Sequence, residues 1–473
     1  MNRDGGGRRR NWIQLFTAMS SPHAIIIPFP AQGHVIPLMA LSHSLVAHGF
    51  KITFINSEFN HERVVASLSQ NGADGVEGIR MVSFPDGLAP GEDRNDPQKL
   101  FESIIRVMPG YLEELIKQMN ALGGDRVTCV IADGSMAWPL DVAQKMGIRS
   151  AFFWPASAAL LALFHNISKM IQDGIIDADG MPERSETFQL SPGMPSMNPS
   201  QLPWNFAGDL EAERFFFKLI ISNVQAMKLA ETIICNSFYD LEPPSFTLFP
   251  NLVPVGPLLT SQQFGKAVGH FWQVDTTCMS WLDEQPANSV IYVAFGSLAV
   301  FNQHQFQELA LGLELSGHPF LWVVRNDLKD GIDDSLLDGF RDRVEGYGKL
   351  VEWSPQQQVL AHPSIACFFS HCGWNSTLEG VKNGVPFLCW PFLFDQFLNR
   401  TYICDVWKTG LSIDPDDKGF APSEQIKEKV DQIIGDEEMK ARALMWKDIA
   451  NRCTKEGGSS YKNSKSFVDA MKE

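Results

Sequence analysis

One short stretch of the sequence concentrates side chains that could do chemistry. Residues 371–380, HCGWNSTLEG, carry an imidazole, a thiol, an indole, an amide, hydroxyls and a carboxylate. These types could form a metal site, a nucleophile with its base, an anion-binding turn or a well-capped helix. The apolar run IACFFSH predicts a strand, and STLEGVKNG predicts a helix that ends at Gly384.

A turn from a parallel strand into a helix binds anions for physical reasons. The start of the helix presents backbone N–H groups without helical partners, together with the positive end of the helix dipole. Gly373 lets the backbone approach a ligand closely. Doubly wound folds bind ligands at the carboxyl ends of their strands, where this turn is predicted to lie.

Other interpretations of the same residues remain open. Ser376 and Glu379 have the S-x-x-E spacing that is typical of a capping box. The His371–Cys372 pair, with His362 and Cys367, has the residue types of a zinc site. Adjacent strand side chains point to opposite faces, however, which argues against this metal site and against Cys372 as a nucleophile beside His371.

His34 and Asp133 follow or end two predicted strands in the first half of the chain. His34 lies in the turn AQGH after HAIIIPFP, and Asp133 ends VTCVIAD. On position alone His34 is typical of a helix-capping histidine, and for Asp133 the N-cap of the next helix is an alternative role.

Short apolar runs alternate with longer amphipathic segments along the whole chain. The runs that predict buried strands are HAIIIPFP, KITFINS, GIRMVSFP, VTCVIADG, RSAFFWPA and TIICNSF, then SVIYVAFGS, PFLWVVR, KLVEW, IACFFSH and PFLCWP. This alternation predicts an α/β protein with two Rossmann-like, doubly wound domains facing a cleft.

The domain boundaries are predicted from the same pattern. The expected segments are a disordered N-terminal extension (1–21), an N-terminal Rossmann-like domain (22–245), a linker rich in Pro and Gly (246–288), a C-terminal Rossmann-like domain (289–455) and a C-terminal helix that packs back on the first domain (456–473).

Composition excludes several classes of protein. The formal net charge of −16 opposes a nucleic-acid partner, because no excess of Lys and Arg exists to neutralise phosphates. The longest near-apolar run, 151–164, is shorter than the roughly 20 residues that span a bilayer. Eight scattered cysteines without CxxC spacing indicate reduced thiols and a cytoplasmic location. We expect a monomer without a transmembrane segment.

Residues 353–396, WSPQQQVLAHPSIACFFSHCGWNSTLEGVKNGVPFLCWPFLFDQ, resemble the 44-residue donor-binding signature of plant family 1 UDP-dependent glycosyltransferases. Ser354 stands where alanine is commoner, and Ala366 where glycine is frequent. The resemblance extends to PFPAQGHVIP, VIADGSMAWPLDVA, YVAFGSL and FLWVVR, and excludes residues 1–20. It implies a GT-B fold with the acceptor in the first domain and the UDP-sugar in the second.

The resemblance also implies a role for each matching residue in binding the donor. Some would hold the uracil and ribose, others the diphosphate, and others the sugar. They are Trp353, Ser354, Gln356 and Glu379 for the nucleoside; Ser297, His371, Gly373, Asn375 and Ser376 for the diphosphate; and Trp374, Asp395 and Gln396 for the sugar. The terminal glutamine of the signature implies UDP-glucose as the donor.

The same resemblance makes His34 the general base and Asp133 its orienting partner. It implies a single displacement with inversion at the anomeric carbon, without a metal and with no cofactor besides the co-substrate UDP-glucose. Residues 177–179, Asp-Ala-Asp, match the DxD of metal-dependent glycosyltransferases of the other major fold. They fall in a polar loop rather than at a strand end, which opposes a metal role.

The predicted function is transfer of glucose from UDP-glucose to a hydroxyl of a small lipophilic acceptor, such as a flavonoid or phenylpropanoid of secondary metabolism. The alternatives are another UDP-sugar donor on the same fold, or a non-catalytic module that binds a UDP-sugar. The presence of both His34 and Asp133 favours an enzyme. The sequence lacks the GxGxxG of a nicotinamide-dependent oxidoreductase.

Overall fold

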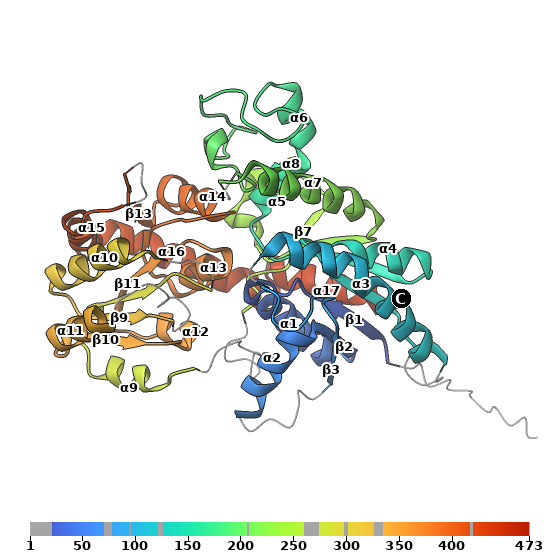
Figure 1. Ribbon diagram of the computed structural model, residues 1–473, viewed down its shortest axis with the longest axis horizontal. Coiled ribbons are helices and arrows are strands. Elements are labelled where there is room, and N and C mark those ends of the chain that lie inside the picture. The colour runs from blue at the N-terminus through green and yellow to red at the C-terminus, as the bar shows by residue number, and fades with distance from the viewer. Residues whose placement is uncertain are drawn as a thin grey trace, which may run out of the picture.

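The computed structural model describes residues 21–70, 78–94, 96–121, 126–205, 208–259, 274–297, 301–325, 334–416 and 420–472. The extension predicted for 1–21 therefore lies outside the described residues, apart from Ser21. The described chain forms two α/β halves that lie next to each other, and each is built on a parallel sheet (Figure 1).

The first sheet has seven parallel strands in the order β3-β2-β1-β4-β5-β6-β7. Its strands are β1 (His23–Ile27), β2 (Lys51–Ser57), β3 (Ile79–Phe84), β4 (Cys129–Asp133), β5 (Arg149–Trp154), β6 (Thr232–Cys235) and β7 (Leu252–Pro254). The helices of this half are α1 (Gln32–Ala47), α2 (Glu58–Gln70), α3 (Pro97–Ala121), α4 (Trp138–Lys145), α5 (Ala158–His165), α6 (Ile167–Gln172), α7 (Leu210–Ala226) and α8 (Pro243–Leu248). The six strands predicted for this half are confirmed.

The second sheet has six parallel strands in the order β10-β9-β8-β11-β12-β13. Its strands are β8 (Val290–Ala294), β9 (Phe320–Val323), β10 (Gly348–Val351), β11 (Ile365–Ser370), β12 (Phe387–Cys389) and β13 (Gly410–Ser412). The remaining helices are α9 (Thr277–Asp283), α10 (Gln303–Ser316), α11 (Asp334–Val344), α12 (Gln356–Leu360), α13 (Trp374–Asn383), α14 (Gln396–Thr401), α15 (Ser423–Gly435), α16 (Glu437–Thr454) and α17 (Ser459–Lys472).

The strands are apolar runs because both faces of each sheet are covered. In β1, Ala24 and Ile26 belong to the core beneath α1, whereas Ile25 and Ile27 belong to the core beneath α3. Successive strand residues point to opposite faces, so a strand covered on both sides needs apolar residues at every position.

The predicted linker 246–288 is wrong at its N-terminal end. It contains β7, the last strand of the first sheet, which pairs with β6. The strand is only three residues long and ends in Pro254, so its sequence resembles an irregular segment. A proline is tolerated there because β7 is an edge strand, and its outer side needs no backbone N–H for pairing.

The C-terminal helix α17 packs on the first half of the chain. Phe467, Val468 and Met471 join the core that contains β1 and α1. Two further contacts fix it: Asn463 Nδ2 donates to the Pro254 carbonyl at 2.8 Å, and Arg149 donates to the Ala470 carbonyl at 2.5 Å.

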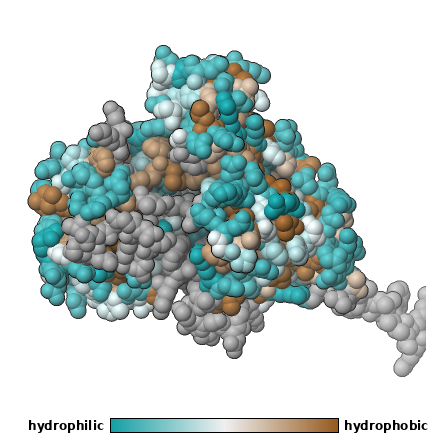
Figure 2. Space-filling model, viewed as in Figure 1, coloured by the Kyte–Doolittle hydropathy of each residue, from teal (hydrophilic) through white to brown (hydrophobic). Residues whose placement is uncertain are grey.

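The face of the molecule in Figure 2 is mainly hydrophilic, with apolar patches of limited size between the polar side chains. In the part of the chain that the structure describes, no helix combines the length and the apolar character that crossing a membrane requires.

Each sheet has one point where the direction of strand addition reverses. In the first sheet this point lies between β1 and β4, and in the second it lies between β8 and β11. The loops that leave two such strands diverge to opposite faces of the sheet and open a crevice at the carboxyl edge. His34 and Asp133 lie at the ends of β1 and β4, and Ser297 and His371 follow β8 and β11, whereas Trp353 follows β10 and Asp395 follows β12.

Candidate active site

His34 and Asp133 meet at the reversal point of the first sheet. His34 lies in the first turn of α1, just after β1, and Asp133 is the last residue of β4. Their Nδ1 and Oδ2 atoms are 2.9 Å apart. The Asp133 side chain is fully buried, whereas the His34 side chain keeps 23% of its surface exposed. The arrangement leaves the far nitrogen of the imidazole, Nε2, as the one that can reach a substrate.

The Asp133 carboxylate is held from several directions. The backbone N–H of Phe29 donates to Oδ2 at 3.2 Å, and that of Ser135 donates to Oδ1 at 2.9 Å. The helix-capping interpretations are wrong, because α1 and α4 have Ala31 and Ala137 at their N-caps and no side-chain cap. The sequence could not decide this, since an N-cap and an orienting carboxylate occupy almost the same place at a strand end.

His371 directly follows β11, the neighbour of β8, and so lies at the reversal point of the second sheet. A Cβ added at Gly296 would lie 2.5 Å from His371 Nε2, and one added at Gly373 would lie 2.4 Å from it. The imidazole therefore fits a slot between two glycines. Burial lowers the pKa of His371 to about 4, so the ring is neutral at physiological pH. A hydrogen bond with the backbone of Ala294 acts on the pKa of the ring in the opposite direction.

Ser297 follows Gly296 in this turn and is half-buried. A nearby residue that sequence reasoning missed is Arg325, just beyond β9. Its buried guanidinium donates to the Gly296 carbonyl at 2.8 Å, and its charge contributes to the lowered pKa of His371. The motif FLWVVR contained this arginine, but a residue two positions beyond a strand gives no signal of where its side chain turns.

Helix α13 begins at Trp374 with Gly373 as its N-cap and without a side-chain cap. The capping-box interpretation of Ser376 and Glu379 is therefore wrong. Ser376 Oγ instead accepts from Gln356 Nε2 at 2.9 Å. Among the described residues no side chain caps the start of this helix, so its N–H groups remain available for an anion.

Buried Glu379, in the middle of α13, and half-buried Gln356, the first residue of α12, form one polar cluster. The Glu379 carboxylate accepts from Gln356 at 2.6 Å and from Gln357 at 3.0 Å. Burial raises the pKa of Glu379. Tyr292 of β8, which sequence reasoning missed, donates its hydroxyl to Gln356 Oε1 at 3.0 Å and lies 2.8 Å from Ser354 Oγ. The apolar strand pattern hid this tyrosine, because a buried phenol fits it as well as phenylalanine does.

Trp353 stands beside this cluster in the segment after β10. Its side chain is half-buried, and its backbone carbonyl accepts from Asp275 N–H at 2.9 Å. The four residues predicted to hold the nucleoside are thus gathered at one carboxyl edge of the second sheet.

Asp395 and Gln396 lie at the start of α14. Asp395 accepts from Asn399 Nδ2 at 2.8 Å, and burial raises its pKa to about 6. The hydrogen bond from Asn399 acts in the opposite direction on this pKa. Gln396 Oε1 accepts from the N–H groups of Phe392 and Leu393 at 2.8 and 3.2 Å.

Trp374 and Asn375 reach from the second half of the chain to the first. The Trp374 indole N–H donates to the Asn236 carbonyl at 2.7 Å, and the side chain is buried. The indole N–H is thus bound to a backbone carbonyl, and the sugar contact of Trp374 stays a prediction. Asn375 Nδ2 donates to the Gly33 carbonyl at 2.7 Å, immediately before His34.

A row of aromatic rings connects His34 to the loop that precedes α14. Phe29 packs edge-on against His34 at 5.1 Å and stacks on Phe101 at 4.6 Å. Phe101 meets Phe216 of α7 at 6.2 Å, and Phe216 meets Phe394 at 6.4 Å.

The aromatic residues within 151–164, 204–206 and 215–217 could by their type form an acceptor surface or the core, and most of those described are core. Phe152, Phe153, Trp154, Trp204 and Phe217 are each less than 5% exposed. Phe206 lies outside the described residues. Aromatic composition alone could not separate the two groups, because both follow the same apolar pattern.

The residues that suggested a thiol nucleophile or a metal site are buried or lie in a turn. Cys372 is fully buried, and its φ of 67° lets the chain turn from β11 into α13. Asp177 accepts from the N–H groups of Asp179 and Met181 at 2.9 and 2.8 Å, which makes it a turn residue. Among the described residues, no group of three or more His, Cys, Asp or Glu side chains is arranged to hold a metal.

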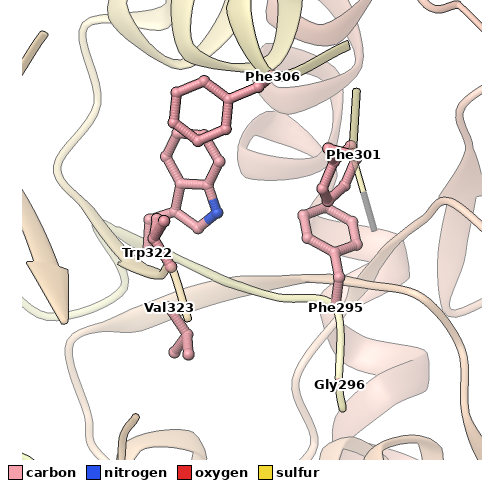
Figure 3. Close-up of a pocket in the computed structure, with 7 residues that line it drawn as sticks. Phe295, Gly296, Phe301, Phe306, Trp322 and Val323 are labelled. Atoms are coloured by element: carbon pink, nitrogen blue, oxygen red, sulfur yellow. The ribbon is translucent and has the colours of Figure 1, made fainter. Parts of the chain in front are cut away.

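A small pocket lies behind the Gly296 turn (Figure 3). Phe306 and Trp322 lie on one side of it, and Phe295 and Phe301 on the other. Its lining is aromatic and aliphatic apart from Gly296, so it belongs to the core of the second half. A substrate site needs polar groups that converge on the ligand, and this pocket does not offer them.

Comparison with known proteins agrees with this geometry. The family model described as UDP-glucoronosyl and UDP-glucosyl transferase matches residues 212–450. UDP-glycosyltransferase 83A1 of Arabidopsis thaliana is 44% identical, over 96% of this chain and 97% of that protein.

Two solved structures are similar over nearly the whole chain. Os79 of O. sativa in complex with UDP has a TM-score of 0.80 at 25% identity, covering 95% of this chain and 100% of that one. A UDP-glucosyltransferase from Polygonum tinctorium has a TM-score of 0.80 at 27% identity, covering 96% and 99%. The fold is GT-B, and the chain belongs to the family of plant UDP-dependent glycosyltransferases. It is an enzyme that transfers a sugar from a UDP-sugar to a small hydroxylated acceptor.

Proposed function

We propose that this enzyme transfers glucose from UDP-glucose to a hydroxyl of a small, planar, lipophilic acceptor, with inversion at the anomeric carbon. The observation that carries the proposal is the pairing of two sites. The His34–Asp133 pair lies at one sheet's reversal point, and the glycine slot of His371 lies at the other. The 2.7 Å contact between Asn375 and Gly33 brings these two sites together.

His34 acts as the general base in this proposal. Its Nε2 takes the proton of the acceptor hydroxyl while that oxygen forms the new bond to the anomeric carbon and the bond to UDP breaks. Asp133 holds Nδ1 at 2.9 Å, which fixes the ring and stabilises the imidazolium that forms. Proton transfer of this kind typically contributes about 10²–10⁴-fold to a rate.

The second domain receives the leaving group. Negative charge develops on the departing UDP, and the uncapped start of α13, with Ser297, Asn375 and Ser376, faces that charge. A neutral His371 donates a hydrogen bond to the diphosphate without carrying a charge that must be desolvated. The nucleoside rests on Trp353 and on the polar cluster of Gln356 and Glu379.

Glucose is proposed as the donor sugar because Gln396 ends the signature and because the Polygonum tinctorium relative is a glucosyltransferase. The acceptor class is argued from the half-buried rings of Phe29, which packs against the base, and Phe394, which are joined through the buried rings of Phe101 and Phe216. The Polygonum tinctorium protein glucosylates indoxyl, which is planar and aromatic. Flavonoids and phenylpropanoids have the same character.

A direct assay tests the function. The protein is incubated with UDP-glucose and a panel of flavonoids, phenylpropanoids and other phenols, without added metal, and both UDP and glucoside are measured. We expect stoichiometric UDP and β-linked glucoside. UDP binding without product from any acceptor would support the non-catalytic module, and faster product from UDP-galactose or UDP-glucuronate would support another donor.

The role of the base is tested by His34→Ala. We expect transfer to fall about 10²–10⁴-fold, while the dissociation constant of UDP from calorimetry changes little, because His34 belongs to the other domain. A loss of UDP affinity as large as the loss of rate would contradict the assignment.

A further inference from the structure

We propose that Asn375 is a positioning residue that fixes the His34 turn relative to the donor, in addition to the diphosphate contact expected of it. This inference rests on the proposed function, because it needs His34 to be the base. Its basis is the contact between the start of α13 and the start of α1.

Asn375 is the second residue of α13, and its side chain reaches across the domain boundary. Nδ2 donates to the backbone carbonyl of Gly33 at 2.7 Å, and Gly33 immediately precedes His34. A side-chain amide nitrogen carries two hydrogens. One can therefore hold Gly33 while the other remains for a phosphate oxygen, so that a single residue can touch both reactants' sites.

The preceding residue makes a parallel contact. Trp374 donates its indole N–H to the Asn236 carbonyl at 2.7 Å, just after β6. Two consecutive side chains of the diphosphate turn thus bind two backbone carbonyls of the first domain. The Trp374 contact is buried and lies away from the base, whereas the Asn375 contact lies one residue from it.

The position matters because the two reacting groups belong to different domains. The base and acceptor belong to the first domain, and the anomeric carbon is held by the second. Reacting atoms must be held about 3–3.5 Å apart, and a 1 Å misplacement can cost about 10²-fold in rate. Asp133 fixes the imidazole within its own domain only. The Asn375–Gly33 hydrogen bond ties the turn that carries His34 directly to the second domain.

A double-mutant cycle tests the inference. We expect Asn375→Ala to lower kcat on the order of 10-fold, while the Kd for UDP rises by a smaller factor because the diphosphate contact is also lost. In a His34→Ala background, where no base remains to be aligned, the same change should lower kcat by a clearly smaller factor than in the wild-type protein. The residual rates are followed by transfer of radiolabelled glucose.

Asn383→Ala is the matched control. It lies in the same helix and loses a hydrogen bond of similar length, 2.8 Å to the Glu379 carbonyl, but it does not cross the domain boundary. We expect kcat to stay within about 2-fold of the wild-type value. Thermal unfolding of each variant shows whether it folds.

The outcomes separate the possibilities. If Asn375→Ala costs the same factor in both backgrounds, or weakens UDP as much as it slows transfer, Asn375 only holds the diphosphate and the inference is overturned. If the wild-type protein gives no glucoside, or if His34→Ala does not slow transfer, the proposed function itself fails.

Discussion

At the scale of single residues, environment makes two histidines different. His34 keeps part of its surface exposed and is bound at Nδ1 by a fully buried carboxylate. His371 is enclosed between two glycines, and burial lowers its pKa to about 4. The first can exchange a proton with a substrate, whereas the second stays neutral and can only donate or accept hydrogen bonds.

Gln396 is held in a defined orientation, which allows a sharp substitution. Its Oε1 accepts from two loop N–H groups, so Nε2 is the atom that can meet a sugar hydroxyl. Gln396→Glu keeps an oxygen for the loop but loses that donor. We expect kcat/KM for UDP-glucose to fall roughly 10–100-fold, equivalent to about 1.5–3 kcal/mol, as for the loss of one hydrogen bond at a substrate.

Steady-state kinetics with varied donor measures this effect, and the KM for the acceptor serves as the internal control. An unchanged kcat/KM for UDP-glucose would remove Gln396 from the sugar site.

At the scale of elements, two helices differ in whether side chains cap their first N–H groups. Helix α13 has no side-chain cap, and its start is left for an anion. Helix α5 is capped twice: Ser157 Oγ accepts from Leu160 N–H at 3.2 Å, and the buried Glu242 carboxylate accepts from Ala158 and Ala159 N–H at 3.0 and 2.9 Å. A fully satisfied helix start holds its helix in place, whereas an open one binds a ligand.

Glu242 should make stability depend on pH. Burial raises its pKa from 4.5 to about 7. Between these values the folded protein binds a proton that the unfolded chain does not. The free energy of unfolding therefore falls as pH rises from about 4.5 to 7, by at most about 3 kcal/mol from this group. The neighbouring Tyr402 and Cys235 have raised pKa values and stay neutral in this window.

Glu242→Gln removes the titration while keeping one oxygen for the helix start. Urea unfolding of both proteins at pH 5 and pH 7.5 measures the effect. We expect the wild-type protein to lose more stability than the variant between the two pH values. Equal losses would show that Glu242 does not titrate on folding.

At the scale of the whole molecule, indole N–H groups join the two halves. Trp374 binds the Asn236 carbonyl, and Trp407 binds the Leu241 carbonyl at 3.0 Å. The two rings lie 6.5 Å apart between the halves. The apolar cluster around them contains residues from both sheets, such as Phe152 and Tyr292, so the halves share one core at this joint.

Trp407→Phe tests the strength of this joint. Loss of the indole N–H leaves the buried Leu241 carbonyl without its partner, which should cost about 1–3 kcal/mol in the free energy of unfolding. Trp446→Phe is the control, because the Trp446 ring lies 6.1 Å from Trp407 and its N–H has no partner among the described residues. Denaturant unfolding measures both variants. An equal loss of unfolding free energy in the two would show that the Trp407 hydrogen bond does not stabilise the joint.

The sequence by itself determined the α/β class, most strands and the turn HCGWNS as the start of a helix. These depend on local patterns: unbroken apolar runs, a helix that ends at Gly384, and a glycine where strand meets helix. It missed β7 and β13, because a strand of three residues is too short to show an alternating pattern.

Tertiary structure alone decided which polar residues meet. Residues as distant along the chain as His34 and Asp133, or Gly33 and Asn375, come together because the sheets reverse between β1 and β4 and between β8 and β11. The same packing turned Ser376 and Glu379 from apparent caps into partners of Gln356. A local pattern states what a side chain can bind, whereas its actual partner depends on which distant element the fold places beside it.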